Sequence, residues 1–409
     1  MSRPTHLTVG DADGLLAIRR WVRTYVDQGR LPGALTLVAR AGRVELLDVC
    51  GMRDVQRGLA IEPDTLFRIH SMTKPVTSVA ALLLVERGAL HLDDPVAEFV
   101  PSFSGLAVNR KGVADAIDPE SLRRPMTVRH LLTHTSGLTY GEGNPGAVSR
   151  LYREQRTDFD VTDGVLEQVV ERLATIPLLF QPGESWNYGV STDVLGRVVE
   201  VASGQTLDVF MREQIFGPLG MTDTSFAVGD AAAGRLAALY EVDADDQLVL
   251  VESADDSPYV RDVTTLSGGA GLVSTAHDYL RFAEVLRLGG SVDGVRLLDP
   301  SLVRSMTRNQ LGDDLAAMGQ PTFNETSTHG IGFGLGVSVV VDPARTTWPS
   351  SLGEFAWGGY ASTAFWVDPV HDLTVVFLTQ VMPSDHFAIR HELRALVRRA
   401  FTTSSSGLV

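Results

Sequence analysis

A serine and a lysine stand three positions apart, ahead of an apolar run. They are Ser71 and Lys74 in the segment SMTKPVTSVAALLLV. Side chains at positions i and i+3 share one face of a helix. A serine hydroxyl becomes a nucleophile when a base removes its proton, and lysine is such a base only when neutral, a state that burial and nearby cations favour. The pair therefore indicates acyl transfer, with the Ser71 amide at the positive end of the helix as an oxyanion donor.

The same four letters have a second interpretation, because S-x-x-K also occurs by chance. Ser71 is then a helix cap and Lys74 a solvated side chain. Two other segments favour chemistry. Tyr188 in SWNYGVSTD lies at a turn before a helix that starts near Ser191, so its phenol can point into a cleft. Its alternative is a half-buried tyrosine with a hydrogen-bonded hydroxyl.

The second segment is FAWGGYAST, in which two glycines interrupt residues typical of a strand. Gly358 and Gly359, after Trp357, suggest close approach of a ligand to the backbone. The amide of Tyr360, directly after the pair, is a candidate second oxyanion donor. The alternative for these glycines is a strand bulge.

Hydrophobic spacing predicts the elements that must position these residues. A helix is expected from Asp11 to just before Gly29, followed by two antiparallel strands around a tight Ala41–Gly42 turn. Residues 72–85 carry one broad apolar face of a further helix.

The middle of the chain reads as mostly helical and rich in loops. Thr127 is expected to cap one of its helices, and Ser274 or Thr275 another. Strands return after about residue 330. A final helix is predicted with caps at Ser384 and Asp385.

Strands near both ends of the chain most simply share one antiparallel sheet, flanked by the terminal helices. We therefore predict an α/β (α+β) fold. Residues 1–75 and 330–409 form its discontinuous α/β part, residues 76–329 form a large, mainly helical insertion, and the active site lies at their interface.

Charge and composition narrow the partners. The net charge is −15 without any block of Lys and Arg, which argues against nucleic acid and anionic membranes. No apolar run could span a bilayer and residues 1–20 lack the pattern of a signal peptide, so we expect a cytoplasmic protein. With one cysteine, Cys50, and no metal-binding motif, neither a metal nor another cofactor is predicted. The oligomeric state is not predicted.

The motifs SMTK, HTSGL, YGV and WGG, in this order and at these separations, resemble the serine β-lactamase and penicillin-binding-protein superfamily over about residues 12–400. The chain is most similar to its class C-like esterases, the family VIII carboxylesterases, and also resembles the fungal lovastatin-type acyltransferases. This resemblance implies a class C β-lactamase-like fold. It makes Ser71 the acylated serine, Lys74 the S-x-x-K lysine and Tyr188 the tyrosine of Y-x-N.

The resemblance further implies that the amides of Ser71 and Tyr360 form the oxyanion hole, and that Trp357, Gly358 and Gly359 line the substrate site. Two positions depart from the β-lactamase pattern. Val190 replaces the asparagine of Y-x-N, and Trp357 replaces the lysine of K-T-G, the cation for the carboxylate of β-lactams and peptidoglycan stems.

A neutral indole at Trp357 predicts a preference for neutral esters. The expected activity is that of a carboxylesterase acting on small-molecule, short-chain esters through a Ser71 acyl-enzyme. An acyltransferase that uses the same acyl-enzyme, a class C-like β-lactamase or D,D-peptidase, and a non-catalytic binding protein are the alternatives. His70 and His134 are assigned to packing, and the absence of a G-x-S-x-G elbow counts against an α/β-hydrolase.

Overall fold

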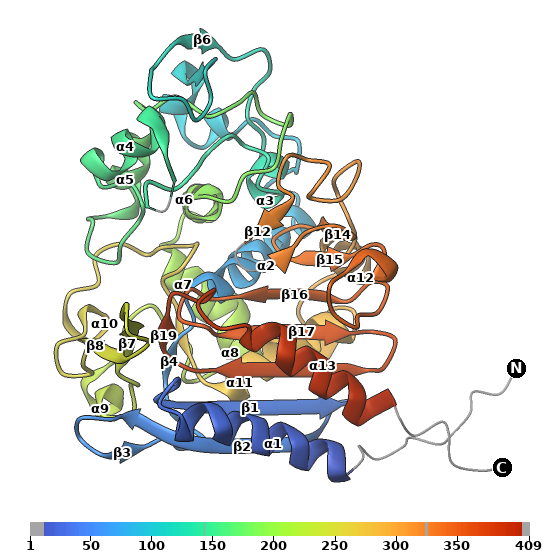
Figure 1. Cartoon of the computed structure of the whole chain (residues 1–409). Coiled ribbons are helices and arrows are strands. Elements are labelled where there is room, and N and C mark those ends of the chain that lie inside the picture. The colour runs from blue at the N-terminus through green and yellow to red at the C-terminus, as the bar shows by residue number, and fades with distance from the viewer. Residues whose placement is uncertain (1–11, 143, 324–325, 403–409) are drawn as a thin grey trace, which may run out of the picture.

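The computed structural model describes residues 12–142, 144–323 and 326–402. Its centre is an eight-stranded antiparallel sheet with the strand order β14-β15-β16-β17-β18-β1-β2-β3 (Figure 1). The strands are β1 (Gly33–Arg40), β2 (Arg43–Asp54), β3 (Leu59–Ala60), β14 (Ile331–Phe333), β15 (Ser338–Val340), β16 (Phe355–Gly358), β17 (Ala364–Asp368) and β18 (Leu373–Leu378). Strands from the two ends of the chain meet where β1 pairs with β18, with Leu35 opposite Leu378. The predicted fold class is confirmed.

Local signals set the first hairpin. Ala41 and Gly42, between β1 and β2, have φ angles of 48° and 81°. Two successive left-handed residues are what a two-residue type I′ turn requires, and this turn matches the twist of the strands.

The terminal helices α1 (Ala12–Asp27) and α13 (Ile389–Thr402) pack together over one face of the sheet (Figure 1). Successive strand residues point to opposite faces. Trp366 and Val375 therefore join the terminal helices in one core, while Phe365 and Val376 face a second core under α11 (Ala276–Arg287).

The final helix begins later than predicted. Ser384 and Asp385 are not its caps, because α13 starts at Ile389. Tertiary contacts hold the preceding residues: the His386 ring lies 2.8 Å from a carboxylate oxygen of Asp246, and Phe387 packs edge-on against Tyr25. Asp11, the predicted start of the first helix, lies outside the described residues.

The remaining elements lie between the two sets of sheet strands in the chain. They are β4 (Phe67–Arg68), α2 (Thr73–Glu86), β5 (Ala107–Asn109), β6 (Pro119–Ser121), α3 (Val128–Leu132), α4 (Gly146–Gln155), α5 (Leu166–Leu173), α6 (Ser191–Ser203), α7 (Leu207–Met211), α8 (Gly217–Leu219), α9 (Asp230–Ala233), β7 (Leu239–Val242), β8 (Leu248–Glu252), α10 (Pro258–Arg261), β9 (Val273–Ser274), β10 (Ser291–Val292), β11 (Val295–Arg296), α12 (Pro300–Met306), β12 (Thr322–Phe323) and β13 (Thr326–Ser327), while β19 (Val381–Met382) follows β18. Thr127 caps α3 and Thr275 caps α11 with their side chains, as predicted.

Helix α2 is buried on every side rather than on one face, because each residue from Thr73 to Leu84 is buried. Its polar side chains bond inside the core: Thr77 donates to the carbonyl of Gly268, and Ser78 to that of Lys74. Helix α11, from within residues 76–329, also packs on the central sheet. The division into two discontinuous parts stays a prediction. Among the helices of the described residues, none is long and apolar enough to cross a membrane.

Candidate active site

Ser71 lies in a single 3₁₀ turn, His70–Met72, between β4 and α2. The segments on both sides of this turn are fixed. The Gln380 side chain bonds the amide and the carbonyl of Arg68, each at 3.0 Å, and the Tyr279 hydroxyl donates to the Met72 carbonyl at 2.8 Å. These contacts hold the hydroxyl of Ser71 at the head of a buried helix.

Lys74 is 0% exposed, so it is not the solvated side chain of the alternative interpretation. Its Nζ atom lies 3.3 Å from Ser71 Oγ, 2.9 Å from the Tyr140 hydroxyl and 3.0 Å from the Gly269 carbonyl oxygen. A neutral amine can donate two of these hydrogen bonds and accept the third from the serine O–H. The geometry thus allows Lys74 to take the proton of Ser71.

A buried carboxylate supports the lysine from behind Gly269. Asp193 Oδ1 accepts hydrogen bonds from the Gly269 amide at 2.9 Å and from the Ser267 hydroxyl at 2.5 Å. Burial raises the pKa of Asp193, while Lys74 and these hydrogen bonds act in the opposite direction. Gly269 therefore connects an acidic group through its amide to the lysine through its carbonyl.

Tyr140 is a site residue that the sequence analysis missed. It stands two positions after the HTSGL motif, and this proximity was the available signal. Burial and then the neighbouring Tyr188 raise the pKa of the Tyr140 phenol well above its usual value, so the phenol keeps its proton at neutral pH.

Tyr188 also contacts Lys74, but through the face of its ring and not through its hydroxyl. Lys74 Nζ lies over the face of this ring, 4.6 Å from its centroid, and the Tyr140 ring packs edge-on at 5.5 Å. Among the hydrogen bonds between described residues, none joins the Tyr188 hydroxyl to Ser71 or Lys74. The Asn187 side chain fixes the turn by donating to the Leu138 carbonyl at 2.9 Å. The structure brings the predicted trio together, and the catalytic role of Tyr188 stays a prediction.

Two histidines flank this cluster. The His134 ring packs against Trp186 and Phe333 and lies 5.0 Å from the Tyr188 ring. Burial and then Lys74 hold the pKa of His134 well below its usual value, and burial followed by nearby cations lowers the pKa of His70 to about 3. Both imidazoles are therefore neutral at physiological pH and belong to the packing of the site.

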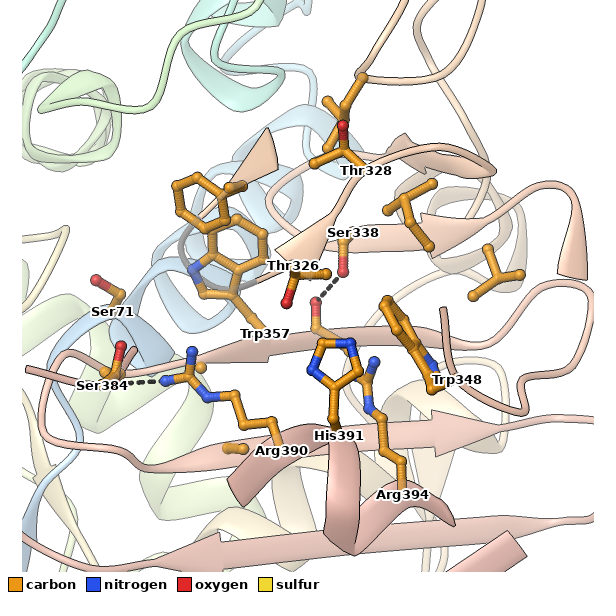
Figure 2. A pocket seen from close by; sticks show the side chains of 18 of the residues that line it. Ser71, Thr326, Thr328, Ser338, Trp348, Trp357, Ser384, Arg390, His391 and Arg394 are labelled. Carbon is orange, nitrogen blue, oxygen red and sulfur yellow. Dashed lines mark hydrogen bonds between the residues drawn. The ribbon is translucent and has the colours of Figure 1, made fainter. Parts of the chain in front are cut away.

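Ser71 opens into a pocket of about 180 Å³. Figure 2 shows Ser71 on one side of the Trp357 side chain and Trp348 on the other. Tyr188, Gly358, Gly359 and Tyr360 also line the pocket, so every predicted site residue except the buried Lys74 borders it. Val190 is fully buried at the N-cap of α6.

Helix α13 adds charged residues that the sequence analysis did not assign to the site. Arg390, His391 and Arg394 line the pocket together with Glu354 (Figure 2). Arg394 lies 3.7 Å from Glu354, and Arg390 donates to backbone carbonyls after β16. The pocket wall therefore contains arginines even though Trp357 replaces the lysine of K-T-G. These arginines already contact groups of the protein.

The two glycines after Trp357 are explained by the protein itself. A Cβ on Gly358 would lie 2.8 Å from the Arg390 guanidinium carbon, and one on Gly359 would clash with the carbonyl of Ile69. The Arg390 side chain and the segment before Ser71 thus approach these glycines closely, and both glycines also border the pocket, so the approach of a ligand to this backbone stays a prediction. The amide of Tyr360 donates no hydrogen bond to another described residue.

Known proteins resemble this chain over most of its length. The sequence model of the family described as Beta-lactamase matches residues 18–399. The chain belongs to the beta-lactamase family. This membership confirms the predicted superfamily, whose serine enzymes include hydrolases and acyltransferases.

Three known proteins are similar to this beta-lactamase family protein over most of its length. Protein Rv1367c of Mycobacterium tuberculosis is 40% identical over 370 residues, which are 88% of this chain and 89% of the relative. Esterase EstB of Burkholderia gladioli is 35% identical and covers 86% of each chain. The solved structure of EstCE1, described as a hydrolase with promiscuous acyltransferase activity, superposes with a TM-score of 0.80 at 29% identity, over 95% of this chain and 98% of EstCE1.

Proposed function

We propose that the protein is a carboxylesterase that cleaves neutral, short-chain esters through a Ser71 acyl-enzyme, as a family VIII carboxylesterase does. The observation that carries this proposal is the buried Lys74, whose Nζ lies 3.3 Å from the Ser71 hydroxyl beside an open pocket. The similarity to EstB supports an esterase.

Acylation starts when neutral Lys74 takes the proton of Ser71 as its Oγ attacks the ester carbonyl. The amides of Ser71 and Tyr360 receive the developing oxyanion, and each such donor contributes roughly 3 kcal/mol. The new ammonium of Lys74 keeps Tyr140 and Gly269 as acceptors. When the tetrahedral intermediate collapses, Lys74 returns the proton to the leaving alcohol, with Tyr188 at the pocket wall as the relay.

Deacylation repeats these steps with water. The Lys74–Tyr188 pair takes a proton from water as it attacks the acyl-enzyme, the same amides hold the oxyanion, and the proton passes to Ser71 as the acid leaves.

The pocket supports small, uncharged substrates. Its volume of about 180 Å³ is below the roughly 300–1,000 Å³ of pockets for drug-sized ligands. Trp357 offers an apolar wall at the position of the K-T-G lysine. Arg394 faces Glu354, and Arg390 donates to backbone carbonyls, so a substrate carboxylate competes with protein groups for both cations.

A series of p-nitrophenyl esters of increasing acyl length tests this function. Ser71→Ala is expected to lower kcat/KM by at least about 10³-fold, because the nucleophile and its base act as a unit. An alkyl fluorophosphonate should add once to Ser71 in the folded protein. Ser104→Ala, which changes an exposed serine outside the pocket, is the matched control and should keep wild-type rates. Full ester hydrolysis by Ser71→Ala would refute the proposal.

Acyl transfer is the second candidate function, favoured by the description of EstCE1. It uses the same acyl-enzyme, with an alcohol in place of water. Adding an acceptor alcohol to the ester assay and measuring the ratio of new ester to free acid separates the two activities. Nitrocefin in a parallel assay tests for a β-lactamase.

A further inference from the structure

One arginine of α13 is bonded to the turn that carries the predicted oxyanion donor. Arg390 Nη2 donates to the Gly359 carbonyl oxygen at 2.7 Å and to the Thr363 carbonyl oxygen at 3.2 Å. Figure 2 shows its side chain extending from α13 below Trp357 to Ser384, on the side of the pocket on which Ser71 lies. The guanidinium thus lies at the nucleophile's end of the pocket, on the backbone rather than in the space for a substrate.

The acceptor at Gly359 belongs to the same peptide group as the Tyr360 amide. In a planar trans peptide, the C=O and the N–H point in opposite directions. A guanidinium on the oxygen of this peptide therefore fixes its amide to point away from the arginine. The Tyr360 amide donates no hydrogen bond to another described residue, which leaves it available for an oxyanion.

The turn around this peptide is fixed from three directions. The Gly359 amide donates to the Thr363 carbonyl at 2.9 Å, which closes the turn. Gly358 lacks the Cβ that would obstruct the guanidinium. Gly359 packs against the carbonyl of Ile69, two residues before Ser71, so the turn is seated directly on the nucleophile's segment.

A charged donor on the carbonyl also changes the strength of the amide. Hydrogen bonds in a chain polarise one another, and bonds to ionised donors are the strongest. The guanidinium withdraws electron density from the Gly359 oxygen, which makes the Tyr360 N–H a better donor. The effect grows as negative charge develops on the substrate oxygen, and hence favours the transition state over the bound ester.

We propose that Arg390 is a positioning residue of the oxyanion hole, which orients and polarises the Gly359–Tyr360 peptide through the Gly359 carbonyl. This inference rests on the proposed Ser71 acyl-enzyme. It assigns Arg390 a function in catalysis that does not involve contact with the substrate. A salt bridge from Arg390 to an anionic substrate and a purely structural bond are the competing explanations.

The test uses an oxyanion that can be titrated. A small alkyl trifluoromethyl ketone forms a hemiketal with a nucleophilic serine, and the ¹⁹F resonance of the adduct reports the pH at which its oxygen ionises. In Arg390→Met, this pH midpoint should rise by about one unit and kcat/KM for a neutral ester should fall about tenfold, since tenfold in an equilibrium or a rate is the same free energy. Most of the loss should be in kcat. Arg390→Lys, which keeps the charge, should recover part of both effects.

The matched control is Arg398→Met, on the same helix, because Arg398 pairs with Asp368 and Ser351 and does not line the pocket. It should leave the midpoint unchanged. An unchanged midpoint in Arg390→Met, or an equal rise in Arg398→Met, would overturn the inference, and a loss confined to anionic esters would favour substrate binding instead. Thermal melting identifies variants that do not fold. If Arg390→Met does not fold, the pH midpoint of Arg390→Lys decides the test. If wild-type Ser71 forms no adduct, the proposed function itself fails.

Discussion

The sharpest prediction concerns Tyr140, because this phenol contacts the proposed general base, Lys74, and not the proposed nucleophile, Ser71. Tyr140→Phe removes one of the three hydrogen-bond partners of the Lys74 ammonium, the one at 2.9 Å. Lys74 is fully buried, so water does not replace the lost oxygen. Hydrogen bonds to charged groups contribute about 1.5–3 kcal/mol. In the proposed mechanism this bond strengthens when Lys74 takes the proton and becomes an ammonium, so most of the loss falls on the transition state.

At about 1.4 kcal/mol per decade, kcat/KM should fall roughly 10- to 150-fold in Tyr140→Phe. The assay is hydrolysis of a short p-nitrophenyl ester, with burst kinetics to follow acylation separately. Tyr240→Phe is the control: Tyr240 is also buried, but its hydroxyl bonds the Val55 amide and Gln56, away from the pocket. It should lower stability and leave the burst rate unchanged. A burst rate in Tyr140→Phe within twofold of wild type would show that Lys74 does not depend on this phenol.

Two further outcomes follow from the charges and from the pKa values. A p-nitrophenyl ester with a terminal carboxylate on its acyl chain should have a kcat/KM at least tenfold lower than the same compound with that carboxylate masked as a methyl ester. The reason is that a bound carboxylate must displace the contacts of Arg390 and Arg394. Equal kcat/KM values would contradict the proposed preference for neutral esters. His70 has a pKa of about 3 in the folded protein, against 6.5 for the unfolded chain, so the unfolded state binds the proton first and stability should fall as the pH drops from 6.5 toward 3. Asparagine tolerates the left-handed φ of 43° at this position, so His70→Asn should fold and should flatten the dependence of the melting temperature on pH over that window. An unchanged slope would assign the acid sensitivity to other groups.

Features encoded by neighbouring residues were predictable from the sequence. The Ala41–Gly42 hairpin and the caps at Thr127 and Thr275 depend on a few adjacent positions, and the structure has each of them. The spacing of Ser71 and Lys74 is local in the same sense. Tyr188, near the start of α6, could be placed by its turn and by the family resemblance.

Features that depend on contacts between distant segments were not predictable in this way. Tyr140 bonds Lys74, and Asp193 bonds the amide of Gly269, whose carbonyl accepts from Lys74. The two residues come from separate parts of the chain, and the spacing of neither relative to the lysine identifies it. Nothing in the sequence near Arg390 connects it to the site, since the turn it bonds is formed by another segment. The predicted start of α13 was wrong for the same reason, because the contact of His386 with Asp246, a distant residue, holds this segment outside the helix.

The pairing of β1 with β18 constrains when this protein can become active. Leu35 is made long before its partner Leu378, so the ribosome must produce the whole segment between them before the central sheet can close. Gln380, which holds the peptide of Arg68 ahead of Ser71, lies just after Leu378 and is made equally late relative to β1. A nascent chain that stops short of β18 therefore contains Ser71 and Lys74 but lacks the framework that fixes them.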